Sequence, residues 1–132
     1  SVGAILADVL HRQGRDDEAL ELATATRAIS GADDLDAQPR WRAATARVLA
    51  RRGEHAEAEA LAREAQALVA PTDFVDLKGD VHDVLGEVLA ATGRVEEATA
   101  AIERAIALHE QKGNVVSAAR SRSRWRNRAA SA

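Results

Sequence analysis

Three stretches of the chain repeat one pattern at nearly constant spacing. They begin at Gly14, Gly53 and Gly93, which lie 39 and 40 residues apart, and they read GRDDEALELATATRAI, GEHAEAEALAREAQAL and GRVEEATAAIERAIAL. Each stretch opens with glycine and acidic residues and continues with alanine, leucine or isoleucine at helical spacing. A pattern that recurs with such a period is typical of helical-repeat proteins, in which each unit buries its apolar face against the next unit.

Glycine and proline divide the chain into about seven predicted helices, and no segment shows the alternation of a strand. The three glycines that open the stretches are predicted turns, each between two helices. This organisation predicts three hairpins at about 2–30, 36–69 and 73–112 and a capping helix at about 114–129. Pro39 falls in a first turn, where proline is tolerated. We therefore expect one all-α domain over the whole chain of 132 residues.

Small residues recur where the two helices of a hairpin are expected to cross. Ala19, Ala58 and Ala98 occupy equivalent positions in the three predicted second helices, and Gly86 lies in a first helix. A larger side chain at such a position would push the two helices apart. The pattern predicts close helix packing in a chain that contains only 2% aromatic residues.

The order of these residues resembles the tetratricopeptide repeat family. That family has a Leu-Gly pair and a large apolar residue in the first helix, a turn glycine, and two alanines around a large residue in the second helix. The third unit of this chain matches at Leu85, Gly86, Leu89, Gly93, Ala98, Ile102, Ala105 and Leu108. The second matches at Thr45, Ala46, Leu49, Gly53, Ala58, Ala62, Ala65 and Leu68. The first matches at Leu6, Ala7, Leu10, Gly14, Ala19, Ala23 and Thr26. The resemblance implies a right-handed α-solenoid, with units longer than the usual period of about 34 residues.

The lengthened units also resemble the C-terminal repeat regions of large bacterial multidomain signalling ATPases and nucleotide cyclases. The segments that carry this resemblance read RWRAATARVLARRGE, PTDFVDLKGD and KGNVVSAARSR. It implies that the chain is the regulatory or scaffold segment of a longer bacterial, cytoplasmic signalling protein. The sequence starts at Ser1 and contains no methionine, which agrees with the expectation that it is a fragment.

No residue pattern in the sequence predicts catalysis or a cofactor. The chain lacks cysteine, and it lacks the motifs GxxxxGK[ST], GxGxxG, HExxH and GxSxG. The acidic pairs at 16–17, 33–34 and 96–97 are interpreted as helix-start residues, where carboxylates interact favourably with the helix dipole. We expect a protein that is not an enzyme, has no catalytic residues and binds no cofactor.

The histidines do not predict a metal site. They are His11, His55, His82 and His109, and they fall in different predicted helices or turns. Because no two of them have the spacing of metal ligands, each is interpreted as a surface or interhelix residue. The alternative is a cluster of His82 with Asp83 and Glu87 on one helix, although such acidic faces are usually solvated.

Several arginines surround Trp125 near the C-terminus. They are Arg120, Arg122, Arg124, Arg126 and Arg128. We interpret this segment as a capping helix that packs through Val115, Val116, Ala119 and Trp125 and keeps its arginines in solvent. Binding of nucleic acid is the alternative, which the net charge of −3 disfavours. Trp41, likewise, is interpreted as a packing residue rather than a ligand-stacking one.

The first helix of each unit lines the concave face in tetratricopeptide arrays, and the register places charged residues there. The predicted partner-binding residues are Asp8, Arg12, Arg40, Arg47, Arg51, Asp80, Asp83 and Glu87. They form a basic band beside an acidic band, which suits an extended or helical peptide of mixed charge. The alternatives are that these charges are only solvated, or that the arginines at 47 and 51 form ion pairs with the acids at 83 and 87.

Two functions fit such a face. The first is a non-catalytic interaction scaffold, whose partner is another protein, a peptide or another domain of the same polypeptide. The alternative is a regulatory module that senses a small molecule, although a chain with few aromatic residues has little to line such a pocket. We also expect self-association, because the ends of a truncated solenoid expose apolar surface. No membrane partner is expected, since no apolar run reaches the ~20 residues that span a bilayer. No nucleic-acid partner is expected either, because the net charge is −3.

Overall fold

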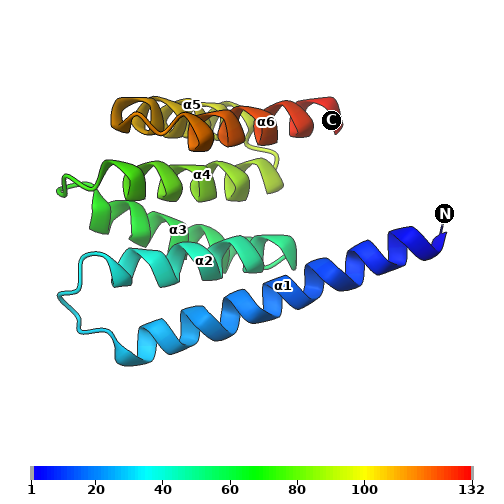
Figure 1. Cartoon of the computed structure of the whole chain (residues 1–132), viewed down its shortest axis with the longest axis horizontal. Helices are drawn as coiled ribbons and strands as arrows, with labels where there is room; N and C mark the ends of the chain where they lie inside the picture. The colour runs from blue at the N-terminus through cyan, green and yellow to red at the C-terminus, as the bar shows by residue number, and fades with distance from the viewer. Residues whose placement is uncertain (1, 132) are drawn as a thin grey trace.

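The computed structural model of the chain is a stack of α-helices (Figure 1). It describes the backbone of residues 2–131 and the side chains of residues 13–126. Within the described backbone there are six helices and no strand: α1 (Val2–Ile29), α2 (Ala37–Arg51), α3 (His55–Val69), α4 (Val75–Ala91), α5 (Val95–Lys112) and α6 (Val115–Ser131). The all-α helical-repeat fold predicted from the sequence is confirmed.

Successive helices run back and forth and pack on their neighbours. α2 and α3 form one hairpin, α4 and α5 form the next, α1 packs on α2, and α6 packs on α5. Figure 1 shows these helices in layers, with α1 on one side of the stack and α5 and α6 on the other. α4 also contacts α2, and a hydrogen bond from Ser121 of α6 to Asp83 of α4 joins α6 to α4. The first helices of successive units, α2, α4 and α6, therefore line one face.

Three glycines end helices by adopting a left-handed conformation. Gly53, Gly93 and Gly113 have φ angles of 83°, 79° and 80°. After Gly53 the Glu54 N–H donates to the Leu49 carbonyl oxygen, and equivalent bonds follow the other two glycines. This arrangement is the Schellman motif, which needs a residue that adopts positive φ without strain. The turns predicted at Gly53 and Gly93 are confirmed.

The structure differs from the sequence prediction at Gly14. This glycine lies inside α1, so that residues 2–29 of the segment predicted as a hairpin form one helix. The described backbone therefore has six helices, close to the predicted number of about seven. A glycine in a helix interior costs only about 1 kcal/mol relative to alanine. A turn at Gly14 would form only if packing of residues 2–13 on residues 15–29 stabilised the chain more than the continuous helix does. In the structure α1 instead packs on α2.

Alanine and glycine bring the two helices of a hairpin close together. Ala58 and Ala98 are fully buried, as the repeat pattern predicts. A Cβ atom added to Gly86 would lie 2.5 Å from Ile102 Cδ1, which leaves no room for a larger residue unless Ile102 moves. α4 therefore packs tightly on α5, and its opposite face is held beside α2.

The capping helix packs through a set of residues that differs in part from the predicted one. Ala118 and Ser121 are buried against the preceding helices, whereas Val115 and Val116 are exposed, as is Ala119. The predicted contact of Trp125 with the core is confirmed. The physical reason is that Ala118, Ser121 and Trp125 are spaced at three and four residues, so they share one helix face.

We expect Gly14→Ala and Gly93→Ala to change stability in opposite directions. Neither added Cβ atom would meet another atom within 4 Å, so only the backbone conformation differs. Alanine at position 14 should stabilise the protein by up to about 1 kcal/mol, because it favours a helix interior. Alanine at position 93 should destabilise it by about 1–2 kcal/mol, because φ there is 79°. Urea denaturation of the two variants measures both effects. Equal destabilisation would place a turn at Gly14 as well.

Candidate functional site

The face formed by α2, α4 and α6 contains two adjoining cavities of about 300 Å³ and 280 Å³. The first is lined by Arg40, Ala43, Ala44, Arg47, Leu77, Asp80, Val81, Asp83, Val84, Ser117, Arg120 and Arg124. The second is lined by Arg47, Ala50, Arg51, Glu87, Ala91 and Arg124. Because they share two arginines, we treat them as one surface, called the groove below.

The structure brings most of the predicted concave-face residues together in the groove. Those that line it are Arg40, Arg47, Arg51, Asp80, Asp83 and Glu87. The side chains of Asp8 and Arg12 lie outside the described residues. Since α2 carries the arginines and α4 the acids, the expected basic and acidic bands lie side by side. Whether these residues bind a partner stays a prediction.

A second basic band on α6 was missed by sequence reasoning. Arg120 and Arg124 line the groove on the far side of α4, so the acidic helix lies between two basic ones. The capping interpretation placed all the arginines of this helix in solvent. The signal that was available is the spacing of four residues, which puts Arg120 and Arg124 on the same helix face.

Ion pairs hold Glu87 between the two basic bands. Arg47 Nε lies 2.9 Å from Glu87 Oε2, and Arg124 Nη1 lies 3.6 Å from Glu87 Oε1. The ion pair expected between α2 and α4 therefore forms at Glu87. Arg51 instead contacts Asp16 of α1 at 2.7 Å. Burial lowers the pKa of Arg124, and the nearby positive charge of Arg47 lowers it further, while Glu87 opposes this change.

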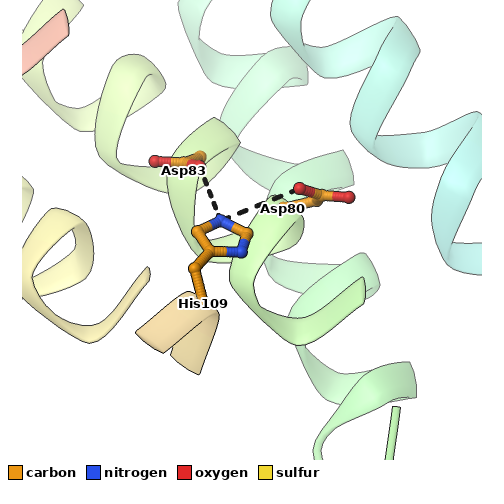
Figure 2. Close-up of side chains that lie close together, drawn as sticks. All are labelled: Asp80, Asp83 and His109. Atoms are coloured by element: carbon orange, nitrogen blue, oxygen red, sulfur yellow. Dashed lines mark hydrogen bonds and ion pairs between the residues drawn. The ribbon is translucent and has the colours of Figure 1, made fainter. Parts of the chain in front are cut away.

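A buried histidine lies beneath the acidic band (Figure 2). His109 of α5 is only 1% exposed, and its Nε2 atom lies 3.2 Å from Asp83 Oδ2 and 3.8 Å from Asp80 Oδ1. Ser121 Oγ of α6 donates to the same Asp83 oxygen at 2.8 Å. Desolvation raises the pKa of Asp80, whose side chain is 56% exposed, and the charge of Asp83 raises it further, while His109 lowers it. The Asp83 carboxylate of α4 thus contacts both α5 and α6.

Gly79 provides the space that His109 occupies. A Cβ atom added to this glycine would lie 2.5–2.9 Å from three atoms of the imidazole ring. Any side chain at position 79 would therefore displace the ring, whatever its rotamer. Sequence reasoning interpreted His109 as a surface or interhelix residue, and the interhelix interpretation is confirmed. It did not pair His109 with Asp83, since 26 residues separate them.

The alternative metal cluster of His82 with Asp83 and Glu87 does not form in the structure. The Nδ1 atom of His82 is hydrogen-bonded to the Lys78 carbonyl oxygen at 2.8 Å. Asp83 faces α5 and α6, and Glu87 faces the two arginines, so the three side chains point to different partners. Position on one helix was therefore a poor guide to which groups meet.

Trp41 packs at the start of α2 outside the groove. Its side chain is buried, and the guanidinium carbons of Arg27 and Arg42 lie 4.6 Å and 4.4 Å from the ring centroid. The ring nitrogen donates to Gln38 Oε1. Such cation–π contacts contribute about 0.5–1 kcal/mol each at exposed sites. The interpretation of Trp41 as a packing residue agrees with these contacts.

Fold and site together define a helical-repeat protein with a charged groove along its first helices. A family model described as tetratricopeptide repeat matches residues 1–23, 39–64 and 80–104, which make up more than half of the chain. The chain therefore belongs to the tetratricopeptide repeat family. Searches of curated proteins and of solved structures find no significant match. None of the described helices combines the length and apolar character needed to cross a bilayer.

Tetratricopeptide repeats generally mediate protein–protein interactions, and the family is generally non-catalytic. The second and third matched segments fall within the two complete hairpins, α2–α3 and α4–α5, and include parts of both helices of each. The described part of the first matched segment lies within α1, where the structure has a single helix. The groove is thus formed by the first helices of the two complete units and by α6.

We expect Gly79→Ala to destabilise the protein by about 1–3 kcal/mol, because the new Cβ atom overlaps the His109 ring. Helix propensity alone would give the opposite sign. Gly14→Ala is the matched control, since it adds the same atom to a helix where nothing lies within 4 Å. Urea denaturation measures the stability of both variants, and NMR resonances of the His109 ring report its displacement. Stabilisation of both variants to the same extent would contradict the position of His109.

Proposed function

We propose that the groove docks a segment of another protein, or of another domain of the same polypeptide, and that the chain acts as a non-catalytic scaffold. The family supports a protein partner. The observation that carries the proposal is the row of charged residues on α2, α4 and α6 around two adjoining cavities. The floor between these charges contains alanines, which let a peptide backbone approach closely.

The charge pattern defines the kind of partner. Glu87 is paired with arginines on both sides, so it contributes little free charge. Among the side chains that the structure describes, Arg120 forms no ion pair, and Arg40 pairs only with exposed Asp36, the residue that precedes α2. These two arginines line the first cavity together with Asp80. An extended or helical segment with acidic side chains around a basic one would complement this arrangement.

The wider context of the proposal is regulatory. The long repeat period and the three segments that resemble bacterial signalling ATPases and cyclases suggest that the chain is a regulatory part of a larger cytoplasmic signalling protein. In such a protein the groove would bind a neighbouring domain. Self-association through an exposed end of the stack belongs to the same proposal.

Small-molecule sensing is the competing function. A cavity of about 300 Å³ lies at the lower end of the volumes that bind small molecules. Its lining is made of charged and aliphatic residues and Ser117, and it contains no aromatic ring. Trp41 is engaged by two guanidinium groups elsewhere. A protein segment that matches several spaced charges therefore fits the groove better than a small apolar ligand.

We expect the double variant Arg40→Glu/Arg120→Glu to weaken docking about tenfold or more, which corresponds to about 1.4 kcal/mol. Both side chains are exposed, so the fold should persist. Arg47 is avoided, because a glutamate there would lie against Glu87. Peptides selected for binding from a random library are measured by fluorescence polarisation at several salt concentrations, and the variant should show a weaker salt dependence.

Arg104→Glu is the matched control, since it reverses an exposed arginine on α5 that does not line the groove. Selected peptides should bind this variant as they bind the unchanged protein. Equal loss in both variants, or no loss in the double variant, would contradict the groove as the docking surface. Thermal stabilisation by members of a metabolite library, in the absence of any peptide binder, would favour the sensing function.

A further inference from the structure

Three potential metal ligands from two helices meet beneath the groove. The carboxylates of Asp80 and Asp83 on α4 and the imidazole of His109 on α5 each offer one atom, and these atoms all lie within 4.8 Å of one another. Figure 2 shows the two carboxylates on the same side of the ring, facing its Nε2 atom. Two of the three side chains are buried, so their positions are fixed by packing rather than by solvent.

Buried polar atoms without partners concentrate at this cluster. Among the described side chains, Asp83 Oδ1, His109 Nδ1 and His55 Nδ1 are the buried atoms that form no hydrogen bond. Two of the three belong to the cluster. Buried carboxylate oxygens normally have hydrogen-bond or metal partners, because an unsatisfied acceptor in the interior is unfavourable. The Asp83 side chain is 6% exposed and the residue lines the first cavity. Its Oδ1 atom has no partner, and its Oδ2 atom is the oxygen that faces His109 Nε2.

Other polar residues surround His109 and Asp83. Asp76 Oδ1 lies 3.9 Å from Nδ1 of His109, on the nitrogen opposite to the two carboxylates. At this distance Asp76 and Nδ1 form no hydrogen bond, whereas Nε2 faces Asp83 Oδ2 at 3.2 Å. Binding of a cation at Nε2 therefore requires the ring proton to be on Nδ1, on the side of Asp76. Ser121 donates to Asp83 Oδ2 and orients that carboxylate, and Gly79 fixes the plane of the ring.

We propose that Asp80, Asp83 and His109 bind a divalent transition-metal ion of the zinc class, with water completing its coordination. Bonds of about 2.0–2.1 Å to a tetrahedral ion place the ligand atoms about 3.3 Å apart. The two distances from Nε2, 3.2 Å and 3.8 Å, are close to this value, and all three atoms lie within 4.8 Å of one another, so exposed Asp80 has to move inward to complete the site. One imidazole and two carboxylates suit zinc or cobalt better than calcium or magnesium, which prefer oxygen ligands alone.

The site is open to exchange and acts between helices. Asp80 and Asp83 line the first cavity, which gives an ion access from solvent and space for water ligands. A bound ion would join α4 to α5 directly, and through the Ser121 hydrogen bond it would hold α6. The site requires no docked partner, so its test is independent of the function proposed for the groove.

The test uses the whole chain after treatment with a chelator. Zinc ion is added and followed by isothermal titration calorimetry and by the thermal unfolding midpoint, and cobalt ion is followed by its visible absorption. We expect one ion per chain, a midpoint that rises with zinc concentration, and a cobalt spectrum typical of four- or five-coordinate geometry.

Variants assign the ligands. Asp83→Asn and Asp80→Asn should each weaken zinc affinity at least about tenfold, and Ser121→Ala about 10–100-fold, as loss of an orienting partner does. Asp80 is exposed, so its variant tests the site even if buried Asp83→Asn or a change at His109 unfolds the protein. His82→Gln is the matched control, because it removes a histidine of α4 that is bonded to the Lys78 carbonyl. It should leave the affinity unchanged.

Two results would overturn the proposal. The first is no stoichiometric zinc binding by the unchanged chain, which would make the cluster an ordinary buried ion pair. The second is zinc binding that persists in Asp80→Asn and is lost in His82→Gln, which would assign the ion to a different histidine. Neither result would affect peptide docking to the arginines of the groove.

Discussion

The close approach of α4 to α5 is the contact on which the rest of the structure depends. Gly86 and Gly79 both lie inside α4, and each accommodates a side chain of α5, Ile102 and His109 respectively. A glycine in a helix interior costs about 1 kcal/mol relative to alanine, so two of them in one helix are unfavourable unless packing compensates. Here the packing fills the space that each missing side chain leaves. Because α4 is fixed against α5, its opposite face is set beside α2 and α6, where the groove forms.

Electrostatics in the groove then follows from the order of the helices. An acidic helix between two basic ones lets Glu87 contact arginines on both sides. Pairs of this partly exposed kind contribute about 0–1 kcal/mol each, so their main effect is on position rather than stability. They hold Arg47 and Arg124 across the middle of the groove, while Arg40 and Arg120 stay available at the first cavity. The same helix order therefore supplies both the internal ion pairs and the charges that face solvent.

Local signals explain what could be predicted from the sequence and what could not. The helices, the turns at Gly53 and Gly93 and the small residues at helix crossings depend on neighbours in the chain, and the sequence predicts them. Gly14 has the same local signature, but whether a glycine turns or continues a helix depends on which surfaces pack together, as α1 packs on α2. The packed face of α6 was also misassigned, since its apolar residues are few. The contact of Asp83 with His109 depends on how α4 and α5 cross, and the spacing of residues along the sequence does not predict that crossing.

Asp83 connects the chemistry beneath the groove to the shape of the groove. Its Oδ2 atom accepts a hydrogen bond from Ser121 and faces His109, so one carboxylate joins three helices. Hydrogen bonds to a charged group contribute about 1.5–3 kcal/mol, more than the longer, partly exposed ion pair of Glu87 with Arg124 of α6. The position of α6, and with it that of Arg120 next to Ser121, therefore depends more on Asp83 than on the surface charges. Any change in what this carboxylate binds acts on the basic band of α6 through a single side chain.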